Sequence, residues 1–508
     1  MTAAASPDAG APSGPAVSDD APLRLNLLLA RRLEEASIRY CHWKSNVAID
    51  RTLSGDNDID LLVDPDQVRQ FTEVLSSVGF VRVRSGHDVP GIESFYGFDS
   101  DSGRLVHVHA HYKLVLGDDR TKNYRLPIEG PYIRSARRDR AFRIPAPEFE
   151  YIVLVIRLVL KYCTWDEIGW SALRGRRARP KGSEQAELED LTARVDNRRV
   201  ETVLAQHLPC LGPPLFSRCV ATVTPNASLR SRVAVARRLE RALQPYSRRS
   251  RGLDRAVRIS RRITLALTRR LREPAKSRPV AGGAMIGIIG GDGSGKSTAL
   301  SSLESWLGSE FDVRLVHLGK PKWSMTTVAA RAALKILDSA AAAGARIVPV
   351  PPVRRLSERI VLFRPLVWLV CMARDRSLAY RRAHRFALGG GVVLCDRYPH
   401  RRLVSMDVPR IDQMPGGDST SRIVRTMARL EKTYHRSILP PELLIVLRVD
   451  PEIAVERKTT ESPESVRRRG AEVWNVDWRV VGAHVVDASQ SKEAVERELK
   501  ALVWSALG

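Results

Sequence analysis

Hydrophobic residues recur with two different periods in the first 150 residues of the chain. The stretches 23–38 (LRLNLLLARRLEEASI) and 66–79 place apolar residues three and four positions apart, which predicts amphipathic helices. The run 58–63 (DIDLLV) is short and apolar, and 104–116 (RLVHVHAHYKLVL) alternates like a half-buried strand. We therefore expect helices and strands to be mixed in this segment.

The helical period dominates from residue 148 to about residue 275, where we expect no strand. The run starts with EFEYIVLVIRLVLKY, and the later stretch 253–271 repeats an apolar residue at every fourth position. The four apolar residues of this stretch predict one apolar helix face, and most of its arginines lie elsewhere on the helix. The apolar residues are Ile259, Ile263, Leu267 and Leu271. Further on, 358–372 (ERIVLFRPLVWLVCM) is strongly apolar, but Arg364 interrupts it. It predicts a buried helix and no transmembrane span.

Changes in composition indicate where the chain divides. The first 22 residues are rich in Ala, Ser, Pro, Gly and Asp, which is typical of a disordered tail and unlike a signal peptide. The stretch 273–283 (EPAKSRPVAGG) has the composition of a linker, and an apolar strand (AMIGII) follows it. We expect three folded parts: an α+β domain over 23–147, a basic helical region over 148–272, and a three-layer α/β domain with a parallel sheet over 284–508.

The charge and the cysteines of the chain bear on its partners and its cellular compartment. The net charge is +25, and residues 171–280 hold 26 Lys and Arg against 9 Asp and Glu, a net of +17. Such a region is either a solvated helical surface or a contact for a polyanion or an anionic membrane surface, and charge alone does not choose. The six cysteines form no CxxC pair, which is typical of a reducing cytosol and predicts a cytoplasmic protein. An oligomer is possible.

A phosphate-binding motif lies directly after the strand AMIGII and before the helical sequence STALSSLESWL. The motif GxxxxGK[ST] is matched in full by Gly290, Gly291, Asp292, Gly293, Ser294, Gly295, Lys296 and Ser297. Its glycines let backbone N–H groups approach phosphate oxygens, and the helix N-terminus adds partial positive charge. We expect Lys296 to reach the β and γ phosphates of ATP, Ser297 to ligate Mg²⁺, and Thr298 to border the nucleotide.

A second apolar strand, 391–395, ends at Asp396, where a carboxylate could join the Mg²⁺ shell. Asp396-Arg397-Tyr398 resembles the DR[YFH] motif of thymidylate kinases, and the loop form GxDGxGK[ST] resembles theirs as well. The resemblance covers about 284–508. It continues through LPPELLI at 439–445, VDPE at 449–452, Arg457-Lys458 and VDASQ at 486–490.

This resemblance implies an ATP- and Mg²⁺-dependent phosphotransferase with roles at the matching positions. Asp292 would lie near a sugar hydroxyl of the acceptor, and Arg376, Arg397 and Tyr398 would bind the acceptor. Some family members carry a catalytic arginine directly after the aspartate, where this chain has Gly293. The arginine would then have to come from the basic lid segment that follows VDPE at 449–452 in the resemblance. The lid candidates are Arg457, Arg467, Arg468 and Arg469.

Two segments depart from the thymidylate kinase pattern. His317–Pro321 replaces the family's Arg-Glu-Pro-Gly, and Pro399–Val404 replaces its Ala-Tyr-Gln. Both segments shape the acceptor pocket in that family. A nucleoside monophosphate is therefore the default small-molecule acceptor, and a sugar or glycan precursor is the alternative.

The N-terminal domain carries a second group of candidate residues. Trp43–Asn46, followed by GDNDIDLLV at 55–63, resembles the nucleotidyltransferase superfamily, in which a small-residue turn precedes a D-x-D on a strand. Asp58 and Asp60 point to the same side because side chains repeat every two residues in a strand. Together they could hold Mg²⁺ and a nucleoside triphosphate, as a possible second metal site.

The superfamily's third carboxylate normally comes from a later strand, and histidine replaces it here. His109 stands in its place, and His107 and His111 share its face, so these residues could form a metal or phosphate site. Histidine suits softer metals better than Mg²⁺. Two readings stay open for this domain: a nucleotidyltransferase, with the kinase domain regulatory, or a binding module without catalysis. A third class is a nucleotide-dependent scaffold that docks on a polyanion.

Overall fold

The computed structural model describes residues 21–85, 91–118, 121–224, 226–268, 276–347, 351–400, 402–403, 408–414, 421–459 and 461–508. The side chains of residues 265, 268, 338, 340–347 and 351–362 are outside this description. The chain divides into two compact units. The first unit is Met1–Phe80 with His87–Glu273, and the second is Val81–Gly86 with Pro274–Gly508.

A small mixed sheet forms one part of the first unit. Its strands lie in the order β1 (Tyr40–His42), β2 (Ile59–Val63), β5 (Arg104–His111) and β4 (Ile92–Asp99). Strand β2 is parallel to β5, whereas β1 and β4 are antiparallel to their neighbours. Helices α1 (Arg24–Glu35), α2 (Ile49–Leu53) and α3 (Val68–Ser77) accompany it. The predicted helix 23–38 and strand 58–63 are confirmed.

The predicted strand 104–116 is two strands. Strand β5 ends at His111, and the chain turns so that β6 (Leu114–Leu116) pairs with β7 (Tyr124–Leu126). The backbone N–H of Leu114 donates to Oε1 of Glu129 at 3.3 Å, on α4 (Glu129–Arg134). A short hairpin of β8 (Arg137–Asp139) and β9 (Phe142–Ile144) follows.

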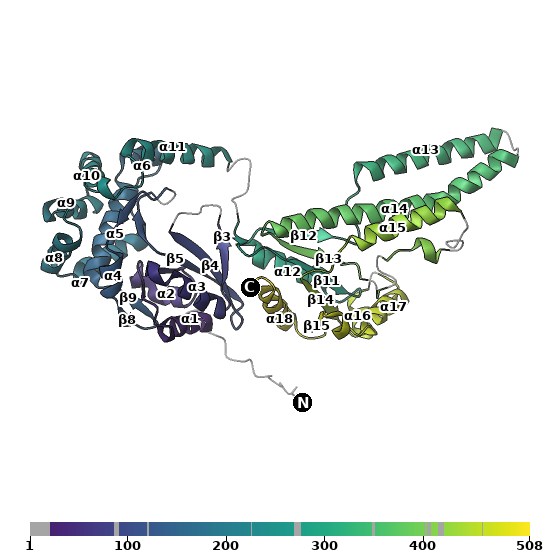
Figure 1. The fold of residues 1–508 in the computed structure, drawn as a ribbon, viewed down its shortest axis with the longest axis horizontal. Coiled ribbons are helices and arrows are strands. Elements are labelled where there is room, and N and C mark those ends of the chain that lie inside the picture. Colours follow the sequence, from purple (N-terminus) through teal and green to yellow (C-terminus); the bar gives the residue numbers. More distant parts are fainter. Residues whose placement is uncertain are drawn as a thin grey trace, which may run out of the picture. The chain divides into compact units, whose positions relative to one another are not determined.

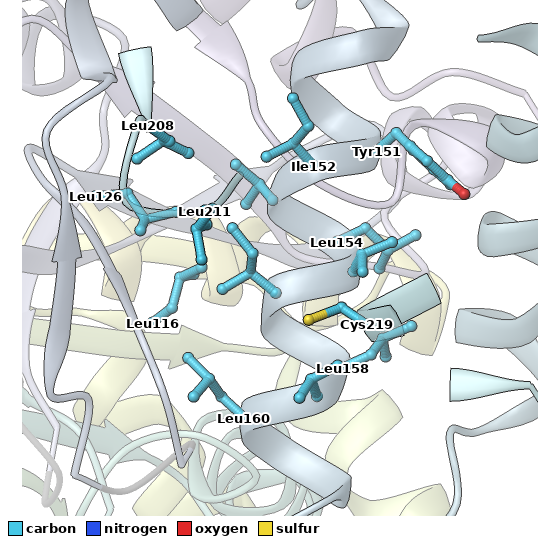
Figure 2. Close-up of a cluster of buried hydrophobic side chains, with 14 of the residues drawn as sticks. Leu116, Leu126, Tyr151, Ile152, Leu154, Leu158, Leu160, Leu208, Leu211 and Cys219 are labelled. Atoms are coloured by element: carbon cyan, nitrogen blue, oxygen red, sulfur yellow. The ribbon is translucent and has the colours of Figure 1, made fainter. Parts of the chain in front are cut away.

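Helix α5 (Pro147–Tyr162) is the centre of the larger core of this unit. Leucines of β6 and β7, leucines of the connection from α8 to α9 and a cysteine of α9 gather around it, as Figure 2 shows for Leu116, Leu126, Leu208, Leu211 and Cys219. Fourteen of its sixteen residues are buried, and the buried set includes Glu148, Glu150 and Arg157. The helices that surround it are α6 (Trp165–Ala172), α7 (Gly182–Arg194), α8 (Asn197–His207), α9 (Pro213–Val223) and α10 (Leu229–Ala242). From residue 148 to 268, the described residues form no named strand, as predicted.

Helix α11 (Arg251–Thr268) buries its charged face and exposes its apolar face, the reverse of the usual arrangement. Asp254, Arg258 and Arg262 are buried, with 2%, 5% and 4% of their surface exposed. The apolar face expected from the sequence points to solvent, since Ile263 is 47% and Leu267 61% exposed. The arginines face inward because acidic side chains from distant segments meet them there: Arg262 binds Asp118 and Glu167 at 2.7 Å, and Arg258 lies 3.4 Å from Asp166 and 3.3 Å from Glu240.

The second unit is built on a five-stranded parallel sheet. The strand order is β12 (Val313–His317), β13 (Val392–Asp396), β11 (Met285–Gly290), β14 (Leu443–Arg448) and β15 (His484–Asp487). Helix α14 (Pro351–Leu388) covers one face, and α12 (Lys296–Gly308) packs with α18 (Lys492–Ser505) on the other (Figure 1). A short pair of strands, β3 (Val81–Arg84) and β10 (Arg278–Pro279), also belongs to this unit.

Long helices extend from this sheet. Helix α13 (Met325–Ile347) lies along α14, which in turn contacts α15 (Arg422–Arg436) (Figure 1). The window 358–372 is helical as predicted, but it is not fully buried: of its described side chains only Leu366 is buried, and Trp368 is 37% exposed. No helix in the described part of the chain is long and apolar enough to cross a membrane.

Candidate functional site

The motif Gly290–Ser297 forms the connection from the central strand β11 to helix α12. Gly293 and Gly295 both adopt a φ of +80°, in the left-handed region that glycine occupies without strain. Gly295 is the N-cap of α12, so the first free N–H groups of this thirteen-residue helix open beside the loop. Ser297 and Thr298 lie in the first turn and are exposed. This is the strand, turn and helix that the sequence predicted.

Lys296 folds back onto the loop. Its ammonium donates to the carbonyl oxygens of Gly290 at 2.8 Å and Gly291 at 2.5 Å. Burial lowers the pKa of Lys296 to about 8, although the neighbouring Asp292 carboxylate acts in the opposite direction. The lysine that would bind phosphate is therefore held at the loop by two carbonyl groups.

Asp292 lies between two arginines from distant segments. Its side chain forms a hydrogen-bonded ion pair with Arg469, and Nη2 of Arg397 lies 3.8 Å from its Oδ1. Arg469 also binds Glu461, with 3.0 Å between Nη2 and Oε2. Asp292 is only 8% exposed, so these ion pairs are partly shielded from solvent. The loop, the end of β13 and helix α17 (Pro463–Trp474) thus meet around one carboxylate.

Asp396 ends strand β13, the neighbour of β11, with Asp396 paired in register with Ile288. Its Oδ1 is buried and has no hydrogen-bond partner among the described residues, and its Oδ2 lies 3.4 Å from Nε2 of His317. Arg397 directly follows with a φ of +53°, an unusual conformation for a residue other than glycine. A buried carboxylate oxygen without a partner is costly unless a cation or a donor reaches it.

The lid arginines divide by their contacts. Arg457, on α16 (Pro451–Arg457), donates to the carbonyl of Ala488 at 2.8 Å, and Arg467 forms an exposed ion pair with Glu452 at 2.7 Å. Arg468 is exposed. Arg469 alone of the four makes a contact with Asp292. Helix α17 lies against the loop itself, because a Cβ on Gly291 would be 3.1 Å from Cα of Gly470.

Two of the predicted acceptor-binding residues, Arg376 and Tyr398, lie in different places. Arg376, on α14, is buried and donates to the carbonyl of Leu318 at 2.8 Å, beside the carboxyl end of β12. Tyr398 is 4% exposed and donates to the carbonyl of Leu439, and a Cβ on Gly287 would lie 2.9 Å from its ring. Tyr398 therefore supports the sheet and borders a cavity of about 800 Å³ that no residue of the phosphate loop lines.

In the first unit, strands β2 and β5 bring the predicted carboxylates and histidines together. Asp60 lies opposite His109 in the parallel pairing. Nδ1 of His107 is 3.3 Å from Oδ1 of Asp58, and Nδ1 of His109 is 3.7 Å from its Oδ2. Lys44 binds Asp60 at 2.9 Å.

The carboxylates and His111 have shifted pKa values. Burial opposes ionisation of Asp60, but the Lys44 ammonium and the histidines outweigh it and hold its pKa well below the usual range. At Asp58, too, His107 and His109 outweigh the effect of burial and lower the pKa. Burial lowers the pKa of His111 to about 4. Both carboxylates are therefore ionised at neutral pH, beside a buried neutral imidazole.

Acidic groups of the helical region occupy the turn before these carboxylates. The backbone N–H of Ser45 donates to Oε1 of Glu187 at 2.7 Å, and Nδ2 of Asn46 donates to Oε1 of Glu150 at 2.8 Å. Side chains of the helical region therefore fill this turn from within the protein, next to the strand pair that places Asp60 opposite His109.

A comparison with models of protein families finds no match, and a search of curated proteins also finds none. Sequence reasoning did not single out the contact of Arg469 with Asp292 or that of His317 with Asp396. The triple arginine 467–469 marked the segment, but nothing in its pattern marks which arginine points to the loop.

Proposed function

We propose that the second unit is an ATP-dependent phosphotransferase that transfers the γ phosphate of ATP to a small acceptor. One observation carries the proposal: a complete phosphate loop leaves the central strand of a parallel sheet, and Asp396 and Arg397 end the neighbouring strand at the same edge. Ligands of open α/β sheets bind at the carboxyl ends of the strands. The resemblance of the sequence to thymidylate kinases supports the same assignment.

The residues present fit a nucleotide with Mg²⁺. The exposed Ser297 hydroxyl and the unpartnered Oδ1 of Asp396 are oxygen ligands of the kind Mg²⁺ prefers. They would hold the ion, whose chemistry is to neutralise charge on the transferring phosphoryl group. Lys296 would exchange the carbonyls of Gly290 and Gly291 for phosphate oxygens. The loop N–H groups and the start of α12 would bind the remaining phosphate charge.

Two arginines support an acceptor that itself carries a phosphate. Arg397 lies 3.8 Å from Asp292, and Arg376 lies beside the carboxyl end of β12, next to β13. A planar guanidinium group binds two oxygens of one phosphate at once, which balances the phosphate charge and orients the acceptor. A nucleoside monophosphate is the default acceptor. A sugar or glycan precursor is the alternative, because 317–321 and 399–404 differ from the thymidylate kinase pattern.

Arg469 is the lid arginine best placed to reach the transferring group. It already contacts Asp292 within the loop, and α17 touches the loop at Gly291. An arginine directly after Asp292 is excluded sterically, because a Cβ on Gly293 would lie 2.5 Å from the carbonyl oxygen of Ala454. The mobile cation that stabilises phosphoryl transfer would therefore come from α17.

The test incubates the full chain with Mg²⁺ and γ-labelled ATP against nucleoside monophosphates and sugar phosphates. Label should pass to one class of acceptor, and Lys296→Ala should lower the rate by a factor of about 10²–10³. Lys492→Ala, at an exposed lysine on α18, serves as the matched control and should keep full activity. Transfer that persists unchanged in Lys296→Ala, or a label that moves only from α-labelled ATP, contradicts the proposal.

A further inference from the structure

The histidines of strand β5 are not used by the proposed phosphotransferase, and they form a cluster with Asp58. One ligand atom each from Asp58, His107 and His109 lie within 4.8 Å of one another. In the described part of the chain, this is the one group of three or more His, Cys, Asp or Glu side chains that meets this spacing. Strand geometry explains it, since His107 and His109 are two residues apart on one face and the parallel neighbour β2 starts beside them.

The spacing of this cluster is close to that of a metal site. Zinc binds imidazole nitrogen and carboxylate oxygen at about 2.0–2.2 Å, so the ligand atoms around one ion lie about 3–3.5 Å apart. The two pairs that Asp58 forms measure 3.3 Å to His107 and 3.7 Å to His109. These pairs use different oxygens of Asp58, and one ligand atom from each of the three residues lies within 4.8 Å of the others. Side-chain movements of about 1 Å would bring all three ligands to one ion.

The surroundings hold the imidazole rings in place. The His107 ring stacks on Tyr96, with ring centroids 4.2 Å apart and an interplanar angle of 2°, and it meets the His109 ring edge-on at 4.1 Å. Fixed rings lose little freedom when they bind an ion, which favours affinity. The Asp58 side chain is half exposed, so an ion can reach the cluster from solvent.

Lys44 forms an ion pair with the neighbouring carboxylate, Asp60, which lowers the ability of Asp60 to bind a cation. Its ammonium is 2.9 Å from Oδ1 of Asp60. The same oxygen lies 3.5 Å from Nδ1 of His109 and 3.7 Å from Nε2 of His111, which packs edge-on against Trp43. The inner carboxylate is therefore neutralised within the protein. The outer set has one carboxylate and two imidazoles, and it leaves coordination positions open.

We propose that Asp58, His107 and His109 bind a divalent transition-metal ion such as Zn²⁺, with positions left open for water or an anionic ligand. Imidazole nitrogen suits Zn²⁺, Co²⁺ and Ni²⁺, whereas Mg²⁺ and Ca²⁺ prefer all-oxygen sites. The ion and its ligands thus differ from the Mg²⁺ site on Asp58 and Asp60 that the sequence led us to expect. The site is independent of the proposed phosphotransferase.

The test uses the full chain, freed of any affinity tag and treated with a chelator. Calorimetric titration with Zn²⁺ should give one site per chain that a large excess of Mg²⁺ does not displace. Titration with Co²⁺ should give visible absorption bands of bound cobalt. Asp58→Asn and the double variant His107→Gln with His109→Gln should each weaken Zn²⁺ binding by about tenfold or more.

Matched controls separate this site from adventitious binding. Asp56→Asn changes a carboxylate two residues away that pairs with Arg104, and His484→Gln changes an exposed histidine of the second unit. Both should keep wild-type affinity, and Lys296→Ala should bind Zn²⁺ normally while it loses phosphotransfer. Asp58 is half exposed, so Asp58→Asn is expected to fold even if the double variant does not. Absence of a Zn²⁺ site, displacement by Mg²⁺, or unchanged binding in Asp58→Asn would overturn the proposal.

Discussion

Glu150 is a buried carboxyl whose charge should make the stability of the first unit depend on pH. It lies on α5 and is 3% exposed. Burial raises its pKa from the ordinary 4.5 to about 7, and the nearby Glu187 acts in the same direction. Hydrogen bonds from Asn46 and the charge of Arg194 oppose the rise without cancelling it. Glu150 also faces Cys41 and Tyr132, whose pKa values are both raised well above the usual range by burial.

The sign of the effect follows from proton linkage. Well below pH 4.5 Glu150 is protonated in both the folded and the unfolded chain, so its full contribution to stability is present. As the pH rises, the unfolded chain loses its proton first, and stability falls until the folded carboxyl also ionises near pH 7. A difference of 2.5 pKa units corresponds to about 3 kcal/mol lost between pH 5 and pH 8.

Glu150→Gln should remove this loss, because the amide keeps an oxygen for Asn46 and cannot ionise. Urea unfolding of the full chain at pH 5, 6, 7 and 8, read by hydrogen exchange of α5 peptides, isolates the first unit. The variant's midpoint should lie about 1 M above that of the wild type at pH 8 and match it near pH 5. Glu189→Gln, at an exposed carboxyl on α7, is the control and should follow the wild type. Equal pH dependence in wild type and Glu150→Gln would refute the reasoning.

Three further predictions concern single elements. Arg258→Leu should cost the first unit about 3 kcal/mol in urea unfolding, because it removes the cation that Asp166, Glu240 and Asp254 share and leaves each of them one other arginine. Ile263→Lys, on the exposed face of the same helix, should change stability by no more than about 0.5 kcal/mol. Gly293→Ala should destabilise the second unit more than Gly295→Ala, because both have a φ of +80° but only the former brings a Cβ against Ala454; the latter should cost about 1 kcal/mol. Arg469→Ala should lower kcat of phosphotransfer by a factor of about 10² or more, whereas Arg467→Ala, whose ion pair with Glu452 is exposed, should leave kcat unchanged.

Local sequence predicted the elements of the second unit well. The strand before Gly290, the helix after Lys296 and the strand that ends at Asp396 all form where expected. Each of these signals is contained in a few consecutive residues: an apolar run of strand length, a glycine-rich turn and a basic helix start. These elements could be predicted because the residues that define each of them are neighbours in the sequence and no distant partner is needed.

Helix α11 shows where local reasoning fails. Its fourfold apolar spacing predicted a helix correctly, and nothing within 253–271 indicates that the opposite face is buried. That outcome depends on Asp118, Asp166, Glu167 and Glu240, which stand up to 144 residues away and meet its arginines. A face of Asp and Arg is buried only when such partners surround it, and a single sequence does not list those partners. The contacts of Ser45 with Glu187 and of Asn46 with Glu150 escaped prediction for the same reason.

The charged groups of the phosphate loop already have partners within the protein, and this bears on how a nucleotide would bind. Lys296 is held by two carbonyls, and Asp292 holds Arg469 and lies near Arg397. Incoming phosphates would have to exchange these contacts, so part of their attraction to the cations offsets contacts that are lost. The same exchange would couple the binding of ATP to the binding of the phosphate acceptor. Phosphate that draws Arg469 away from Asp292 would leave that carboxylate free to accept a hydrogen bond from a hydroxyl of the acceptor molecule. Asp396 differs, since its Oδ1 has no hydrogen-bond partner within the described part of the chain. A cation at that oxygen would displace no hydrogen bond of the described residues, which favours Asp396 as the first ligand of Mg²⁺ in the proposed phosphotransferase.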